Sequence, residues 1–416
     1  MRARGTATQK FMSLHSLMFG WEYPPRHLGG LGVACQGLVR GLINQNVKVT
    51  LVLPFAADGS QENVDVLFPT EKHISTIRVA SLLLPYDSPD QYVQRIQAIP
   101  RETAEMYGDN LGQAVHIFTE TSVEMTRDLQ PDVVHAHDWM TYEAGTRSAR
   151  FHGKPLVAHI HATELDRTHF HPNEWIYGRE RWGFQQADHI IAVSNYTRNI
   201  LIQHYGIDPD KISVVHNGSS ESRHVESAQQ PETTTPTKKR PMVLFLGRLT
   251  IQKGPLHFLE MASMVHRLRP DVQFVVAGDG HMLPSLMDQA VQLGLEDCII
   301  FSGKVSNTEA RKLYAQASCF VMPSLSEPFG LVALEAIAQD TPVILSKQSG
   351  ASEVIGHAFK VDFWDTEKMA DCVLTVLREA PLASQLISEA PRVLQHLTWD
   401  NQAGKVLSIY RNILHS

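Results

Sequence analysis

The sequence of 416 residues lacks several features that would place it in a narrow class of proteins. No apolar run approaches the roughly 20 residues that a membrane-spanning helix needs. Basic residues are too few for a nucleic-acid-binding protein: 37 Lys and Arg stand against 44 Asp and Glu, and the net charge is −7. A polyanion would be repelled by such a surface. The sequence therefore predicts no integral membrane segment and no nucleic acid partner.

Cysteine is also scarce. The four cysteines lie far apart in the chain and form no C-x-x-C pair: Cys35, Cys298, Cys319 and Cys372. This excludes a disulfide framework and a cysteine zinc site, and it favours free thiols in a reducing compartment. The basic stretch 1–10 and the apolar residues after it are not followed by a small-residue cleavage site, so a cytoplasmic protein is expected.

What the chain does contain is a regular alternation of short apolar runs and longer amphipathic stretches. Runs such as Val133–His137 and Met242–Leu246 are typical of strands that are buried on both faces of a parallel sheet. Stretches such as Gly254–Arg269 carry the apolar spacing of helices. The length suits two cores of about 200 residues each. We therefore expect an α/β protein with two doubly wound domains.

One polar segment marks the expected junction of these domains. Residues Ser219–Arg240 are rich in Ser, Thr, Gln, Glu, Lys and Pro, which predicts an exposed loop. We place the boundary within 205–215, just before the next apolar run, with the loop inside the second domain. The domains then comprise 1–208 and 209–396, and residues 397–416 contain a further predicted helix.

Two cations follow a predicted strand in the second domain. Arg248 and Lys253 lie five residues apart, directly after the run Met242–Leu246. The carboxyl ends of strands in open α/β sheets are where ligands bind. Arginine offers a planar fork to phosphate oxygens and lysine offers a mobile charge, so the two can neutralise a departing diphosphate. A solvated basic turn before a helix is the alternative interpretation.

A second turn with the same placement follows the run Cys319–Met322. Pro328 and Gly330 predict a sharp turn, and a helix should begin near Gly330 with its free amides forming an anion site. Glu327 lies just before that helix, and Glu335 lies about two turns into it, where a carboxylate can accept hydrogen bonds from a ribose diol. The alternatives are a helix-capping role for Glu327 and a surface charge for Glu335.

In combination these motifs resemble the family 4 retaining glycosyltransferases, which have the GT-B fold. The resemblance rests on Gly-Arg-Leu-x-x-x-Lys-Gly, then Glu-Pro-Phe-Gly, and a second Glu eight residues after the first. It implies that Arg248 and Lys253 bind the donor pyrophosphate, that Glu327 contacts the donor sugar, and that Glu335 contacts the ribose. The turn amides around Phe329–Leu331 would face the phosphate and the sugar.

A glycine-rich loop in the first domain fits the same resemblance. Gly29 and Gly30 follow the first predicted strand and open a helix, where glycine permits close approach of the backbone to a phosphate or sugar. The loop lacks a full dinucleotide fingerprint, and the second strand ends at Pro54 rather than at an acid, which disfavours a dehydrogenase. Glycogen synthases have a lysine shortly before the paired glycines; Arg26 and His27 stand nearby here.

Histidines cluster at two further strand ends. His135 and His137 share one face of a strand, and His159 and His161 share one face of another, which raises the possibility of a metal site. No supporting carboxylate pattern accompanies them, so we predict no metal. The resemblance implies that His161 is the active-site histidine near the donor sugar and that Asp138 lines the acceptor side. A histidine bonded to backbone and an N-cap aspartate are the alternatives.

The resemblance covers nearly the whole chain. It implies two Rossmann-like domains that face each other across a cleft, with the final helix crossing back onto the first. It also implies transfer of a sugar from a nucleoside diphosphate sugar with retention of configuration, in which His161, Glu327, Arg248, Lys253 and Asp138 would take part. No residue is an obvious covalent nucleophile, so we expect front-face displacement without a cofactor or a catalytic metal.

The amino-terminal loop and the His-Asp-Trp segment most resemble the glycogen and starch synthase branch. We therefore expect UDP- or ADP-glucose as the donor and an α-glucan as the acceptor. Three alternatives stay open: a family 4 enzyme with a different glycoside acceptor, a nucleotide-sugar epimerase of GT-B shape, and a non-catalytic protein that binds nucleotide sugars. The sequence assigns no oligomeric state.

Overall fold

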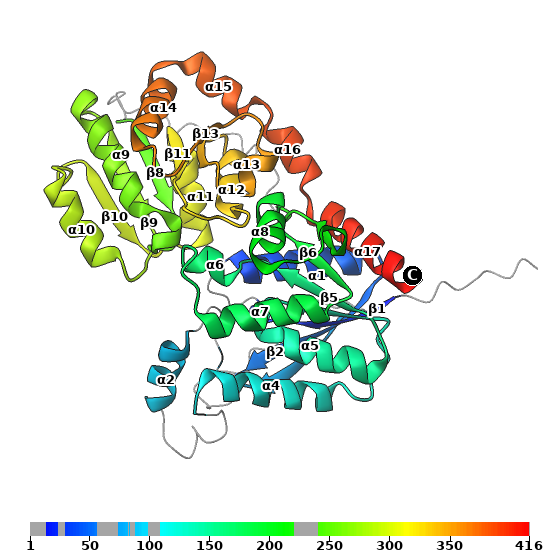
Figure 1. Ribbon diagram of the computed structural model, residues 1–416. Coiled ribbons are helices and arrows are strands. Elements are labelled where there is room, and N and C mark those ends of the chain that lie inside the picture. Colours follow the sequence, from blue (N-terminus) through cyan, green and yellow to red (C-terminus); the bar gives the residue numbers. More distant parts are fainter. Residues whose placement is uncertain are drawn as a thin grey trace, which may run out of the picture. The chain divides into compact units, whose positions relative to one another are not determined.

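The computed structural model describes residues 14–23, 30–55, 74–81, 83, 88–98, 109–219 and 240–415. The described strands form two parallel sheets, one of seven strands and one of six (Figure 1). The larger sheet has the spatial order β3 (Ile74–Ala80), β2 (Lys48–Phe55), β1 (His15–Phe19), β4 (Val133–His137), β5 (Leu156–Ile160), β6 (His189–Ala192) and β7 (Ile212–Val214). The smaller sheet has the order β10 (Ile299–Gly303), β9 (Gln273–Ala277), β8 (Met242–Leu246), β11 (Cys319–Met322), β12 (Val343–Ser346) and β13 (Phe359–Val361).

Both sheets have the same order of connections. In the larger sheet β1 pairs with β2 on one side and with β4 on the other, and in the smaller sheet β8 lies between β9 and β11 in the same way. In each sheet the chain thus forms a central strand first, adds strands outward to one edge, and then returns to the centre to form the other half. Ligands of doubly wound sheets bind at this point of reversal, beyond the carboxyl ends of the strands. The predicted α/β class with two doubly wound sheets is confirmed.

Helices connect the strands throughout the described chain. Those linked to the larger sheet are α1 (Gly30–Asn44), α2 (Pro89–Gln97), α4 (Leu111–Met125), α5 (Trp139–His152), α6 (Glu164–Arg167), α7 (Glu174–Gln186) and α8 (Asn195–Tyr205). The remaining helices are α9 (Pro255–Leu268), α10 (Leu283–Gln292), α11 (Asn307–Gln316), α12 (Leu331–Ala338), α13 (Ala351–Val354), α14 (Thr366–Arg378), α15 (Ala380–Ser388), α16 (Ala390–His396) and α17 (Trp399–His415). Short 3-10 turns occupy Pro209–Lys211 and Ile251–Lys253. Among the described helices, none combines the length and apolar character that crossing a membrane requires.

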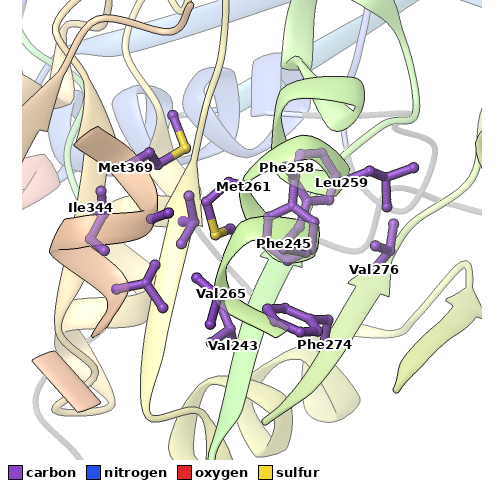
Figure 2. Packing of buried hydrophobic residues seen from close by; sticks show 14 of the residues in the cluster. Val243, Phe245, Phe258, Leu259, Met261, Val265, Phe274, Val276, Ile344 and Met369 are labelled. Carbon is purple, nitrogen blue, oxygen red and sulfur yellow. The ribbon is translucent and has the colours of Figure 1, made fainter. Parts of the chain in front are cut away.

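The smaller sheet is buried on both faces, and its central strand shows why. Val243 and Phe245 of β8 pack in one cluster with α9 residues, and Figure 2 shows Phe245 beside Phe258 and Phe274. Leu244, between them in sequence, belongs to a second cluster with residues of α11 and α12. Successive side chains of a strand point to opposite faces, so a strand covered on both sides must be apolar at every position. This is the continuous pattern that the sequence shows.

Several helices begin where the sequence supplies a capping box. Thr163 precedes α6 and Ser306 precedes α11, and in both the hydroxyl accepts a hydrogen bond from the third helical amide. The acidic side chains at those third positions, Asp166 and Glu309, accept in return from the amide of the cap residue. Two of the free amides at each helix start are thereby satisfied. These local signals fix the entry of α6 and α11 into the fold.

The chain divides into two compact units. The first comprises Met1–His159, Gln186–His189 and Ala403–Ser416, and the second comprises Ile160–Gln185 and Ile190–Gln402. The predicted division at 208/209 stays a prediction. Of the expected polar loop, only its first residue and its last lie among the described residues. The four cysteines are all buried and free.

Candidate functional site

The turns that follow β8 and β11 carry three predicted site residues, and two of them are in contact. Lys253 Nζ donates a hydrogen bond to Glu327 Oε2 at 2.6 Å, and Ser324 Oγ donates to the same oxygen at 3.3 Å. The Glu327 side chain is only 8% exposed, whereas that of Lys253 is 21% exposed. Arg248 lies on the turn after β8 and is exposed. A cation and a carboxylate that were predicted separately from two motifs therefore form one ion pair.

Hydrogen bonds between the two turns hold this ion pair in place. Leu325 N donates to Gln252 O at 2.9 Å. The Gln252 side chain, which is buried, returns a bond from its Nε2 to Ser326 O at 3.1 Å. The residue before Lys253 is thus bonded to the two residues before Glu327. The alternative of a free solvated turn for Lys253 does not describe this geometry.

Gly254 explains why a glycine follows the lysine. Its φ of +67° lies in the left-handed region, and a Cβ built there would lie 2.0 Å from the carbonyl oxygen of Pro323. No side chain fits at that distance, so only glycine allows the two turns to approach this closely. The Lys-Gly pair of the sequence motif is therefore one structural unit: Gly254 allows the two turns to pack closely, and Lys253 then reaches Glu327.

The backbone of Glu327 is also fixed from the other side. Its N–H donates to Gln348 O at 2.9 Å, and its carbonyl accepts from Gly350 N at 3.0 Å. These bonds form an isolated parallel bridge between Glu327 and Ser349. Glu327 is thus held by the turn after β12 as well as by its own turn. Its role as a simple helix cap is not what the geometry shows.

The helix predicted after this turn is present. Gly330 occupies the N-cap of α12 with a φ of +102°, and the first helical residue is Leu331. Phe329 is buried, packed among the core residues of one sheet face. Glu335, in the middle of α12, is half-buried and accepts a hydrogen bond from Tyr314 OH at 3.2 Å. The amino terminus of α12 thus lies three residues after Glu327, where it can attract an anion.

The segment that carries His161 belongs to the same compact unit as Glu327. His161 is buried and stands two residues before Thr163, the cap of α6. Asp166 closes that capping box through its Oδ2 and accepts from Ser326 Oγ at 2.5 Å through its Oδ1. Burial raises the pKa of Asp166, against the opposing effect of these hydrogen bonds. Sequence reasoning missed Asp166, although the Thr-x-x-Asp pattern signals the capping half of its role.

Ser326 receives a further contact from α8. Tyr196 OH lies 2.9 Å from Ser326 Oγ, and burial raises the pKa of Tyr196 to about 12. The start of α8 is held in turn by Glu353, which accepts from Asn195 N at 2.9 Å and from Tyr196 N at 2.6 Å. Nothing in the sequence connects these positions, which lie more than 100 residues apart.

The buried carboxylate of Glu180 forms hydrogen bonds to both ends of α6. Glu180 accepts from Glu164 N at 2.9 Å, from Arg167 Nη2 at 2.8 Å and from Tyr205 OH. Its pKa is raised to about 7, mainly because of burial, and the Arg167 charge opposes this rise. Glu180 is 0% exposed and does not reach solvent. It therefore anchors the helix next to His161 rather than offering a surface charge.

The larger sheet has its own point of reversal, between β1 and β4. Gly30 begins α1, and the amide of Gly32 donates to Glu22 Oε2 at 2.9 Å. Glu22 is buried, so a carboxylate of the protein itself already occupies part of this helix start. Gly29, Arg26 and His27, on which further expectations fell, lie outside the described residues.

Asp138 has an unusual backbone for its position. It stands at the N-cap of α5 with a φ of +59°, and its side chain makes no capping hydrogen bond to the helix. Its amide donates to His159 O at 2.9 Å, which holds the conformation. A left-handed conformation at a residue other than glycine costs about 1–3 kcal/mol and is concentrated at functional sites. The alternative of an ordinary N-cap aspartate is therefore not supported.

Three buried histidines, His135, His137 and His159, form a histidine cluster at the ends of β4 and β5. The rings of His135 and His137 stack with centroids 4.4 Å apart. His135 Nε2 lies 3.2 Å from His159 Nδ1, and His135 Nδ1 lies 2.5 Å from the hydroxyl of Tyr410 in α17. Burial lowers the pKa of His137 to about 3. One nitrogen of each ring lies within 4.8 Å of the others, a spacing that can accept a metal ion, so the expectation of no metal stays a prediction.

Comparison with known families gives two matches along the chain. The family described as Glycosyltransferase Family 4 matches residues 28–223, and the family described as Glycosyl transferases group 1 matches residues 226–393. Together the two matches span almost the whole sequence. The chain belongs to the family 4 glycosyltransferases. The resemblance inferred from the donor-side motifs is confirmed.

Relatives of this glycosyltransferase match over nearly their full length. An uncharacterized glycosyltransferase of Methanocaldococcus jannaschii is 28% identical, over 95% of this chain and 97% of the relative. A glycogen synthase of Mycobacterium tuberculosis is 29% identical, over 95% of this chain and 94% of the relative. A solved sucrose-phosphate synthase from Thermosynechococcus elongatus superposes with a TM-score of 0.77 at 20% identity, covering 97% and 99% of the two chains. The glycosyltransferase therefore has the GT-B fold, as expected.

Proposed function

We propose that this glycosyltransferase transfers glucose from UDP- or ADP-glucose to an α-glucan with retention of anomeric configuration. The observation that carries the proposal is the contact between Lys253 and Glu327 at the reversal point of the smaller sheet, beside the start of α12. Positive charge for a diphosphate and a carboxylate for sugar hydroxyls lie side by side there, at the edge where open α/β sheets bind nucleotides.

Arg248 and Lys253 are proposed to hold the diphosphate of the donor. Negative charge grows on the leaving diphosphate in the transition state, so cations positioned in advance stabilise that state more than the ground state. The amides that begin α12, around Phe329–Leu331, add donors to the same oxygens. Glu335 would bind the ribose hydroxyls, with its carboxylate oriented by the bond from Tyr314.

Glu327 and His161 are proposed to act on the sugar itself. The carboxylate of Glu327 would accept hydrogen bonds from the glucose hydroxyls, and His161 would contact the sugar as it gains oxocarbenium character. Asp138, with its constrained backbone, would face the acceptor, and the loop at Gly29 and Gly30 would approach the donor. The reaction would proceed by front-face displacement, in which a donor phosphate oxygen takes the proton of the acceptor hydroxyl. No metal is needed in this scheme.

The acceptor is the least constrained part of the proposal. The glucan assignment is supported by the opening Glu-Tyr-Pro-Pro and Gly-Gly-Leu-Gly motifs and by the similarity to the mycobacterial glycogen synthase. A family 4 enzyme with another glycoside acceptor, or an epimerase that changes the donor sugar without an acceptor, would use the same donor groups. The experiment must therefore separate donor use from acceptor use.

The test is release of nucleoside diphosphate from UDP-glucose and from ADP-glucose, each with and without glycogen or maltooligosaccharides, in the presence of EDTA. Release that depends on the glucan and on one of the two donors is the expected result. Conversion of the donor sugar into its isomer without release would identify an epimerase. Binding of UDP or ADP without release in any mixture would contradict glucose transfer to a glucan.

A further inference from the structure

Asp166 makes contacts that the donor scheme does not use. The side chain is fully buried and accepts three hydrogen bonds. Its Oδ2 accepts from Thr163 N at 2.8 Å and from Thr163 Oγ1 at 2.7 Å, while its Oδ1 accepts from Ser326 Oγ at 2.5 Å. With three donors directed at one carboxylate, Asp166 acts as an acceptor in every contact.

The two partners of Asp166 adjoin the two side chains proposed to contact the sugar. Thr163 stands two residues after His161, and Ser326 directly precedes Glu327. Asp166 therefore joins the turn that carries His161 to the turn that carries Glu327. These residues belong to one compact unit, although Asp166 and Ser326 are 160 positions apart in the sequence.

Ser326 is held in more than one direction. Its hydroxyl proton is directed to Asp166, so its oxygen is left to accept from Tyr196 OH at 2.9 Å. Its carbonyl accepts from Gln252 Nε2 at 3.1 Å, next to Lys253. Hydrogen bonds from three separate segments thus fix the residue before Glu327, which leaves the backbone of Glu327 little freedom to shift.

We propose that Asp166 is a positioning residue for sugar transfer, which sets the relative placement of His161 and Glu327 through Thr163 and Ser326. This inference rests on the proposed function, because it takes the sugar-contacting roles of His161 and Glu327 from there. Asp166 itself is buried and does not touch the sugar. A displacement of about 1 Å in a reacting group can lower the rate about 100-fold, so these bonds matter for turnover.

Three variants separate the two sides of the contact. Ser326→Ala removes the bond to Asp166 and leaves the capping box of α6 intact. Thr163→Val keeps the shape of the side chain but removes the hydroxyl that bonds to Asp166. Tyr196→Phe removes only the outer contact of Ser326. Ser326→Thr restores a hydroxyl and tests for rescue.

A matched control comes from α11. Ser306 Oγ donates to Glu309 Oε2 at 2.7 Å and accepts from Glu309 N, so it makes the same kind of bonds to an acidic side chain. Ser306 belongs to none of the proposed donor groups and is exposed. Ser306→Ala therefore removes a serine–carboxylate contact of the same chemistry without touching the Asp166 contacts.

Each variant is measured for kcat and KM with the donor that the wild type uses, for the Kd of the matching UDP or ADP, and for Tm. Ser326→Ala and Thr163→Val should lower kcat by about 10- to 100-fold, because sugar contacts are displaced. Tyr196→Phe should lower it less, Ser326→Thr should recover most of it, and Ser306→Ala should leave it unchanged. The Kd of the free nucleoside diphosphate should stay within about twofold, since its contacts lie elsewhere.

Two results would overturn the role of Asp166. One is a kcat of Ser326→Ala and Thr163→Val equal to that of Ser306→Ala per folded molecule. The other is a fall in nucleoside diphosphate affinity as large as the fall in kcat, which would mean that the turn as a whole had collapsed. Absence of nucleoside diphosphate release by the wild type would instead contradict the proposed function, so the two failures are distinguishable.

Discussion

Two regions at the carboxyl ends of strands hold different chemistry: the turns after β8 and β11 in the smaller sheet, and the ends of β4 and β5 in the larger sheet. The turns after β8 and β11 are called the donor-side turns, after their proposed function. They carry an ion pair, Lys253 with Glu327, held by backbone bonds between neighbouring turns. The histidine cluster instead stacks three buried rings, and it bonds through His135 to Tyr410 of α17. The first region holds an ion pair, whereas burial lowers the pKa of His137 in the second.

The two regions differ in the interactions that they can offer to a ligand. A charge that is held by hydrogen bonds at the edge of a sheet is available to a diphosphate, because little reorganisation is needed when the ligand binds. A histidine such as His137, whose pKa burial lowers to about 3, stays neutral near pH 7 and contributes packing instead. We therefore expect changes on the donor side to alter turnover and changes in the histidine cluster to alter stability.

The largest effect should come from the donor-side cations. Arg248→Ala and Lys253→Ala should each lower the rate of nucleoside diphosphate release by about 100- to 1000-fold, because each removes a charge that we propose stabilises the leaving diphosphate. Arg269→Ala is the control, since Arg269 pairs with Asp271 on an exposed turn. Near-normal turnover of Arg248→Ala would remove the basis for assigning the diphosphate to this edge.

The next effect concerns the close approach of the donor-side turns. Gly254→Ala should destabilise the protein more than Gly294→Ala, although both glycines have a φ of +67°. A left-handed alanine costs about 1–2 kcal/mol at either position. At Gly254 the new Cβ also meets the Pro323 carbonyl, and such overpacking adds about 1–3 kcal/mol. Equal losses in denaturant unfolding would show that the turns separate readily and that the approach is not fixed.

A smaller effect is expected in the histidine cluster. Tyr410→Phe removes the hydroxyl that contacts His135 and Ser16, which leaves buried polar groups without that partner. The free energy of unfolding should fall by about 1–3 kcal/mol. Turnover per folded molecule should change less than twofold. Tyr177→Phe, which loses an exposed bond to His204 O, should change neither quantity appreciably. A large loss of turnover in Tyr410→Phe with unchanged stability would contradict the expectation that the histidine cluster affects stability rather than turnover.

The last effect is a dependence of stability on pH that arises from Glu180, in the same compact unit as Lys253 and Glu327. Burial raises the pKa of Glu180 from 4.5 to about 7, so the folded protein holds a proton that the unfolded chain releases. The stability contributed by this group is complete below pH 4.5 and is lost as the pH rises to about 7. The slope is at most about 1.4 kcal/mol per pH unit.

Glu180→Gln does not titrate, so its free energy of unfolding relative to the wild type should rise from pH 4.5 to 7 and then level off. Urea unfolding at a series of pH values measures this difference. A difference that does not vary with pH would mean that Glu180 is ionised throughout, held by Arg167. Glu180 and His137 would then share burial but not the loss of charge.

Much of the fold could be predicted from the sequence because its signals are local. Strands covered on both faces are continuous apolar runs, and Thr163 and Ser306 mark the helices that they cap. The donor-side motif was also visible, since Lys253 and Glu327 stand in turns of recognisable composition. The role of Gly254 had no such signal, because its partner is a carbonyl oxygen, which every residue carries.

Glu22 and Asp138 show where local patterns were insufficient. The paired glycines predicted a helix start whose backbone a phosphate or sugar can approach closely, but Glu22, several residues upstream, already bonds to the amide of Gly32. Asp138 stands at the N-cap of α5 as an ordinary cap would, but its φ is +59° and its side chain makes no capping hydrogen bond. Both differences depend on dihedral angles and on the direction of side chains, which the order of residues does not reveal.

The sequence by itself determined the two parallel sheets, the family and the turns that carry Lys253 and Glu327, since each follows from periodicity or from a contiguous motif. The tertiary structure alone decided that Lys253 pairs with Glu327 and that Asp166 joins Thr163 to Ser326. These contacts link turns that are far apart in the chain. Their geometry is set by strand order and by close packing of backbone, which no local pattern of residues specifies.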